Sequence, residues 1–86
     1  MFRSMQKLPF ERPVYFTRQG SLVERVSSVD EAAYYLLHRW PNPSGTAHEA
    51  ARRKCREVLA KTCGEGAARE AFIVAVAEAG MTIVER

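Results

Sequence analysis

Residues 28–41 have the sequence SVDEAAYYLLHRWP, the most regular stretch of the chain. Ser28 followed by Glu31 is a capping box, in which the hydroxyl accepts a backbone N–H and the carboxylate reaches back to the helix start. Apolar residues then recur with the helical period at Val29, Ala32, Ala33, Leu36, Leu37 and Trp40. Since Pro41 cannot continue a helix, this stretch predicts an amphipathic helix packed against a core.

Two further helices are predicted downstream. Thr46 and Glu49 form a second capping box, which begins a helix that should run to about Cys63 with Gly64 at its end. Its inward positions are Ala47, Ala51, Cys55, Val58, Leu59 and Thr62. A third helix covers about 67–79, with inward positions Ala68, Ala71, Phe72, Ala75, Val76 and Ala79. Because this helix is apolar nearly all round, we expect it at the centre of the domain; the alternative is a homodimer face.

The segments outside the helices favour strands. Strand-forming residues on both sides of a turn at Gln19-Gly20 predict a β-hairpin of about 13–18 and 21–27. Residues 81–84 predict a last strand. Because an isolated hairpin is marginal in water, the last strand should join it. The expected fold is α+β, a three-stranded sheet with helices packed on one face. The pattern leaves open which hairpin strand receives the last one.

The composition is that of a small, mildly basic globular chain. It has 86 residues, 47% of them hydrophobic, and a formal net charge of +3. This length supports one domain, placed at 13–86 after a loosely ordered lead-in at 1–12. No apolar run approaches the ~20 residues of a membrane span, so we expect no membrane contact. Cys55 and Cys63, about 12 Å apart on one helix, cannot pair; with no apolar leader, they predict a cytoplasmic protein.

The first helix carries the residues most typical of a protein interface. Tyr34, Tyr35, His38 and Arg39 are predicted to lie away from its apolar face. Exposed tyrosine and arginine are common where partner proteins bind. Two structural alternatives remain open: one tyrosine packs its ring on another helix, or Tyr35 and Arg39 form a cation–π pair. We predict a non-catalytic interaction or regulatory module with an unknown protein partner, and a homodimer as a further option.

The second helix offers an alternative function. Arg52, Arg53 and Arg56 lie on its basic face, and arginine suits phosphate recognition. The alternative function that this face predicts is weak, sequence-nonspecific nucleic-acid binding, which ranks below the protein-interaction module. The structural alternative is a solvent face of ion pairs at helical spacing, Glu49 with Arg53, Arg53 with Glu57 and Glu57 with Lys61.

Metal, cofactor and enzyme chemistry have little support. Two histidines and one aspartate leave few general bases, and no Cys-x-x-Cys or His-x-x-x-His spacing marks a metal site. We therefore expect no catalytic residue, metal or cofactor. Arg69 interrupts an apolar helix and is expected to bond a carboxylate or carbonyl; the alternative is anion binding.

A family resemblance extends over about residues 10–84. It rests on Pro13-Val14, residues 26–33 (VSSVDEAA), Leu36, Trp40-Pro41, Ala51, Cys55, residues 68–73 (AREAFI) and residues 78–80 (EAG). Together these residues resemble DUF982, a bacterial family of domains of unknown function. The resemblance implies one small compact domain and carries over no catalytic residue.

Overall fold

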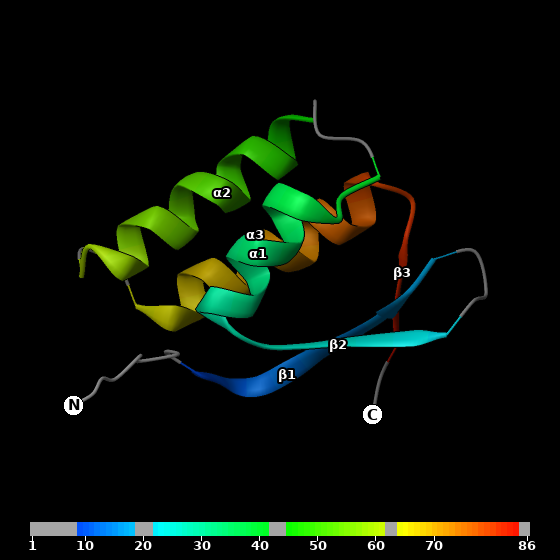
Figure 1. Cartoon of the computed structure of the whole chain (residues 1–86), viewed down its shortest axis with the longest axis horizontal. Coiled ribbons are helices and arrows are strands. Elements are labelled where there is room, and N and C mark those ends of the chain that lie inside the picture. The colour runs from blue at the N-terminus through cyan, green and yellow to red at the C-terminus, as the bar shows by residue number, and fades with distance from the viewer. Residues whose placement is uncertain (1–8, 19–21, 42–44, 62–63, 85–86) are drawn as a thin grey trace.

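The computed structural model describes residues 9–18, 22–41, 45–61 and 64–84. In chain order the elements are β1 (Pro9–Thr17), β2 (Val23–Ser28), α1 (Val29–His38), α2 (Thr46–Leu59), α3 (Glu65–Glu78) and β3 (Thr82–Val84). They form two layers, with the three helices on one side of the three-stranded sheet (Figure 1). The predicted α+β fold is confirmed.

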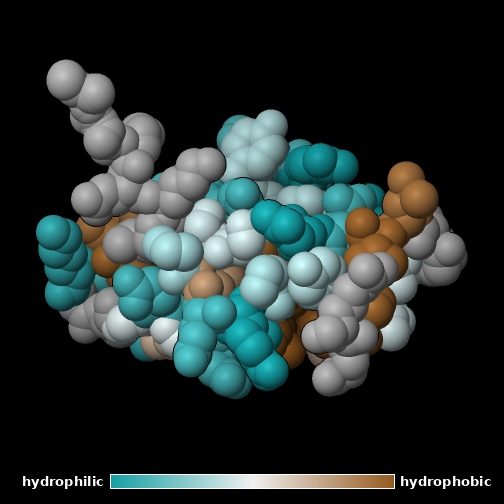
Figure 2. Space-filling view, turned by 90° about the horizontal axis from the view of Figure 1, so that it is seen from below, coloured by the Kyte–Doolittle hydropathy of each residue, from teal (hydrophilic) through white to brown (hydrophobic). Residues whose placement is uncertain are grey.

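The sheet has the order β2-β1-β3, and both pairings are antiparallel. The last strand therefore pairs with β1, which settles the point that the sequence left open. Phe16 of β1 lies opposite Glu24 of β2 and Ile83 of β3. The opposite face of the sheet has no helix over it among the described residues, and hydrophilic and neutral side chains cover much of it (Figure 2).

The strand β1 is longer than predicted. It begins at Pro9, so residues 9–12 belong to the sheet and not to a loose lead-in, and Phe10 is buried in the core. Residues 1–8 lie outside the described part of the chain. The pairing register shifts between Pro9 and Val14, where Pro13 cannot donate to a ladder and favours a bulge.

The helix α1 has its predicted start but a different inward face. Ser28 Oγ accepts the N–H of Glu31 at 3.2 Å, and the Glu31 carboxylate accepts the N–H of Ser27 at 2.8 Å. Tyr35 is buried, whereas Leu37, predicted to face the core, is 57% exposed. The helix is turned so that Tyr35 meets Phe16 of the sheet at 5.3 Å between ring centroids. That contact leaves the side of Leu37 open.

The helix α3 is central, as predicted. It contacts β1, β3, α1 and α2, and its buried residues are Ala68, Phe72, Ala75 and Val76. The Phe72 ring meets Phe16 and Trp40 in edge-on contacts with centroids 5.7 Å apart in both cases. Such pairs add stability beyond the apolar area they bury. This aromatic cluster joins the sheet to the helical layer.

The start of α2 differs from the predicted capping box. Thr46 is the first helical residue, after an N-cap at Gly45 that makes no side-chain cap bond. The Glu78 carboxylate at the end of α3 accepts instead the N–H groups of Ala47 and His48, at 3.0 and 3.1 Å, and the Thr46 hydroxyl at 3.2 Å. A carboxylate suits this place because helix N-termini carry partial positive charge. A Cβ on Gly45 would overlap this carboxylate.

The same turn of α2 also binds the end of α1. His48 is fully buried, and its Nε2 lies 2.8 Å from the carbonyl oxygen of Leu36. A carbonyl can only accept, so Nε2 carries the proton. The last helical carbonyls of α1 lack partners within their own helix, and His48 provides one. The other end of α2 is shorter than predicted: it ends at Leu59, while Thr62 and Cys63 lie outside the described residues.

The cap on α2 makes folding stability depend on pH. The pKa of Glu78 lies below its ordinary 4.5, chiefly because the carboxylate accepts a hydrogen bond from the N–H of Ala47. Hydrogen bonds from His48 and Thr46 lower it further. A lowered folded-state pKa stabilises the fold above the unfolded-state pKa, and this contribution is lost as pH falls through the folded value. We expect Glu78→Gln to melt at a lower temperature than the unaltered protein at pH 7, and the difference to shrink as the pH falls below 4.5. Thermal melts by circular dichroism at several pH values measure this.

The matched control is Glu70→Gln, which alters an exposed glutamate of the same helix. Its melting temperature should equal that of the unaltered protein at each pH value. Equal melting temperatures for Glu78→Gln and Glu70→Gln at pH 7 would contradict the cap.

Candidate interaction groove

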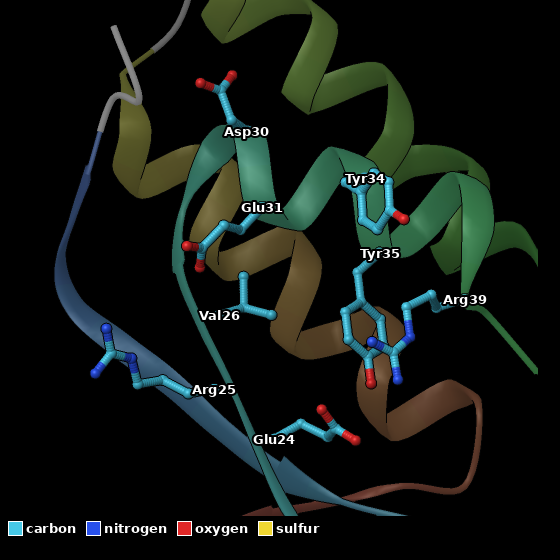
Figure 3. Close-up of a pocket in the computed structure, with 8 residues that line it drawn as sticks. All are labelled: Glu24, Arg25, Val26, Asp30, Glu31, Tyr34, Tyr35 and Arg39. Atoms are coloured by element: carbon cyan, nitrogen blue, oxygen red, sulfur yellow. The ribbon is translucent and has the colours of Figure 1, made fainter. Parts of the chain in front are cut away.

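A groove of about 470 Å³ lies between β2 and α1. Its walls come from both elements and from the residue after the helix: Glu24, Arg25, Val26, Asp30, Glu31, Tyr34, Tyr35 and Arg39 (Figure 3). The strand runs directly into the helix at Ser28, so the two elements diverge from one corner. Figure 3 shows Glu24 near the wide end of this wedge, facing Tyr35 and Arg39.

The groove borders the free edge of the sheet. β2 is an outer strand and has no second strand partner in the described part of the chain. The N–H of Ser27 bonds to Glu31 rather than to β1. Because successive residues of a strand point their main-chain groups to opposite sides, every second N–H and C=O of β2 points away from β1. An unpaired edge of this kind is a template for another strand.

Tyr35 forms the floor of the groove and is a core residue. It is only 6% exposed, and its ring contacts Phe16 at 5.3 Å and Trp40 at 6.3 Å. The prediction that Tyr35 lies on an exposed outer face was therefore wrong, because the helix is turned toward the sheet. Its buried hydroxyl has no hydrogen-bond partner among the described residues. In Figure 3 the hydroxyl points along the groove toward Glu24.

Arg39 closes the wide end of the groove. Its guanidinium carbon lies 5.0 Å from the centroid of the Tyr35 ring, which is the cation–π pair that the sequence offered as an alternative. The main chain of Arg39 is held by Arg18, whose Nη2 donates to the Arg39 carbonyl at 2.9 Å. A polar group entering here would meet a guanidinium, a hydroxyl and the Glu24 carboxylate together.

The remaining predicted interface residues split between two places. Tyr34 is exposed and lines the groove, whereas His38 does not line it and stacks on Tyr34 at 4.8 Å between ring centroids. The sequence missed Glu24, Arg25 and Val26. The signal that could have found them is the capping box itself, because a helix start placed directly after a strand brings the two elements into one wedge.

The basic residues of α2 lie apart from this groove. Arg52 and Arg56 line a separate hollow between α1 and α2, and Arg53 is exposed outside it. Glu57, a predicted ion-pair partner on this helix, bonds Lys54 at 3.2 Å. Arg69 has a structural role, since its Nε donates to the carbonyl of Arg12 at 2.8 Å.

Three other kinds of site can be considered among the described residues: a metal site, a membrane span and a reactive thiol. Within those residues, no group of three or more histidine, cysteine, aspartate or glutamate side chains is placed to hold a metal ion. No described helix is long and apolar enough to cross a membrane. Burial raises the pKa of the Cys55 thiol to about 11, so this side chain stays a neutral thiol near pH 7.

These features define a small α+β domain with an open strand edge beside a groove lined by tyrosine and charged side chains. Residues 12–83 match the family model described as "Protein of unknown function (DUF982)", and the chain belongs to this family. The fold is similar to the NMR structure of Agrobacterium tumefaciens protein Atu1219, with a TM-score of 0.77 and 29% sequence identity over 98% of this chain and 89% of that one. The comparison with curated proteins found no match.

The unpartnered hydroxyl of Tyr35 leads to a prediction about stability. A buried polar group without a partner costs about 1 kcal/mol or more, so Tyr35→Phe should raise the free energy of unfolding by about 1 kcal/mol. Urea denaturation measures the change. Tyr34→Phe is the control, since Tyr34 is exposed and its substitution should alter stability by less than about 0.5 kcal/mol. A less stable Tyr35→Phe would show that ordered water or another group bonds the hydroxyl.

Proposed function

We propose that this protein is a non-catalytic interaction module that binds an extended segment of a partner protein as an added strand on β2. The observation that carries the proposal is the free edge of β2 opening onto a groove floored by the unpartnered Tyr35 hydroxyl. Strand addition is a recurring mode of peptide recognition, with main-chain bonds for affinity and side-chain pockets for specificity. A cytoplasmic location stays a prediction.

The groove polarity favours a peptide main chain. Arg39 can only donate, the Glu24 carboxylate can only accept, and the Tyr35 hydroxyl can do either. A peptide amide brings an N–H and a C=O to one place without a net charge, so it can satisfy both sides. A bare phosphate would suit Arg39 but would meet the carboxylates of Glu24 and Asp30, which disfavours nucleic acid here.

A second copy of the chain fits this edge less well. Antiparallel self-pairing centred on Arg25 sets Arg25 opposite its own copy, and centring on Glu24 does the same for that carboxylate. Like charges directly opposite each other destabilise a strand pair. A partner with a different sequence avoids this repulsion.

A substitution at Arg25 tests the strand addition. Arg25→Pro removes a main-chain N–H of β2, and proline is tolerated on an edge strand where that N–H faces solvent. Arg25→Ala removes the side chain but keeps the N–H, so it is the matched control. Peptides selected on the unaltered protein from a displayed random library provide the probe. We expect Arg25→Pro to weaken their binding by about tenfold, and Arg25→Ala to change it by less than about threefold.

Amide hydrogen exchange gives a second readout of the same binding. In the free protein the β2 amides that point away from β1 should exchange faster than those that bond it, and bound peptide should protect them. Equal affinity of the two Arg25 variants, or a library that yields no binder, would overturn the proposal.

A further inference from the structure

A second hollow, of about 130 Å³, lies on the other side of α1. It is bounded by Ala33 and Leu37 of α1 and by Arg52, Cys55, Arg56 and Leu59 of α2. Its volume is well below the ~300 Å³ or more of ordinary small-molecule sites. A hollow of this size suits one apolar side chain presented by a larger partner.

The rim of this hollow exposes leucine side chains. Leu37 is 57% exposed and Leu59 is 46% exposed, although the sequence predicted both in the core. The floor is Cys55, a buried residue that remains an uncharged thiol. Single exposed apolar residues are ordinary on protein surfaces, but a set gathered around one hollow is typical of a contact surface.

The charge of the rim has one sign. Arg52 and Arg56 lie one helical turn apart, and no carboxylate lines the hollow. Across the ranges that the structure describes, neither guanidinium forms an ion pair. An apolar centre beside two arginines is complementary to a surface with apolar side chains flanked by carboxylates.

We propose that the hollow between α1 and α2 docks an acidic amphipathic helix of a partner protein. One apolar side chain of that helix enters the hollow between Leu37 and Leu59, and its carboxylates bond Arg52 and Arg56. Helix-in-groove recognition uses apolar anchors at helical spacing in this way. This surface does not depend on the edge of β2, so it extends the proposed function and stands or falls separately from it.

Two other occupants fit the observations less well. A second copy of the chain would bring the arginines of both copies together across the interface, where like charges repel. Nucleic acid would leave Leu37 and Leu59 against a phosphate backbone, with no apolar surface to cover them. The acidic helix satisfies the leucines and the arginines at once.

A designed peptide tests the docking directly. The probe is a capped helix of about 14 residues, with leucines at helical spacing and glutamates elsewhere, labelled for fluorescence anisotropy. Its control carries lysine in place of every glutamate. We expect saturable binding of the acidic peptide and at least about tenfold weaker binding of the lysine form.

Matched variants locate the binding on the protein. Leu37→Ser should weaken the acidic peptide by about tenfold, whereas Val74→Ser should not, although Val74 of α3 is equally exposed at 57%. Arg56→Ala should weaken it by about threefold, whereas Arg53→Ala removes the same charge outside the hollow and should leave the affinity unchanged. Arg25→Pro should also leave it unchanged, which separates this site from the strand edge.

Several results would overturn the inference. They are the absence of saturable binding at about 1 mM peptide, equal binding of the lysine peptide, and equal losses in Arg53→Ala and Arg56→Ala. A concentration-dependent dimer in analytical ultracentrifugation that Leu37→Ser abolishes would assign the hollow to a second copy. Oligonucleotide binding lost equally in Arg53→Ala and Arg56→Ala would assign this face to nucleic acid.

Discussion

The first turn of α2 bonds to both neighbouring helices, and the positions of the candidate surfaces follow from it. Its N–H groups donate to Glu78 at the end of α3, and the His48 ring donates to the Leu36 carbonyl near the end of α1. Helix ends leave main-chain groups unsatisfied, and here side chains from other helices satisfy them. Trp40 then packs between His48 and Phe72, with centroids 5.6 and 5.7 Å away. The end of α1 is therefore held from two sides.

As a result, α1 lines two hollows whose side chains differ in chemical character. On the sheet side it presents Tyr35 and Arg39 beside a free strand edge. On the α2 side it presents Ala33 and Leu37 beside arginines. A helix of ten residues cannot bury its whole circumference in so small a domain, so its two flanks stay available. An extended segment suits the first flank and a helix suits the second.

The local signals of the sequence were informative where the interacting residues are neighbours in the chain. The capping box at Ser28 and Glu31, the helical periodicity of α3 and the β-formers of the hairpin each depend on residues a few positions apart. The fold class and the central place of α3 followed from them. The family resemblance, over about residues 10–84, agrees with the family match at 12–83.

The errors have a common physical origin. Thr46 and Glu49 match a capping box, but a carboxylate 32 residues away occupies that place, because a charged group on a packed neighbour competes with a local hydroxyl. Tyr35 and Leu37 are both compatible with a helical apolar face. The contact with the Phe16 ring buries Tyr35 and leaves Leu37 exposed.

The sequence pattern alone thus predicted the elements of this protein, their order and the exposed position of Tyr34 on α1. The packing of the layers determined the rotation of α1 about its axis, the cap on α2, the strand that pairs with β3 and both hollows. These features come from contacts between residues far apart in the chain, and periodicity carries no information about such contacts.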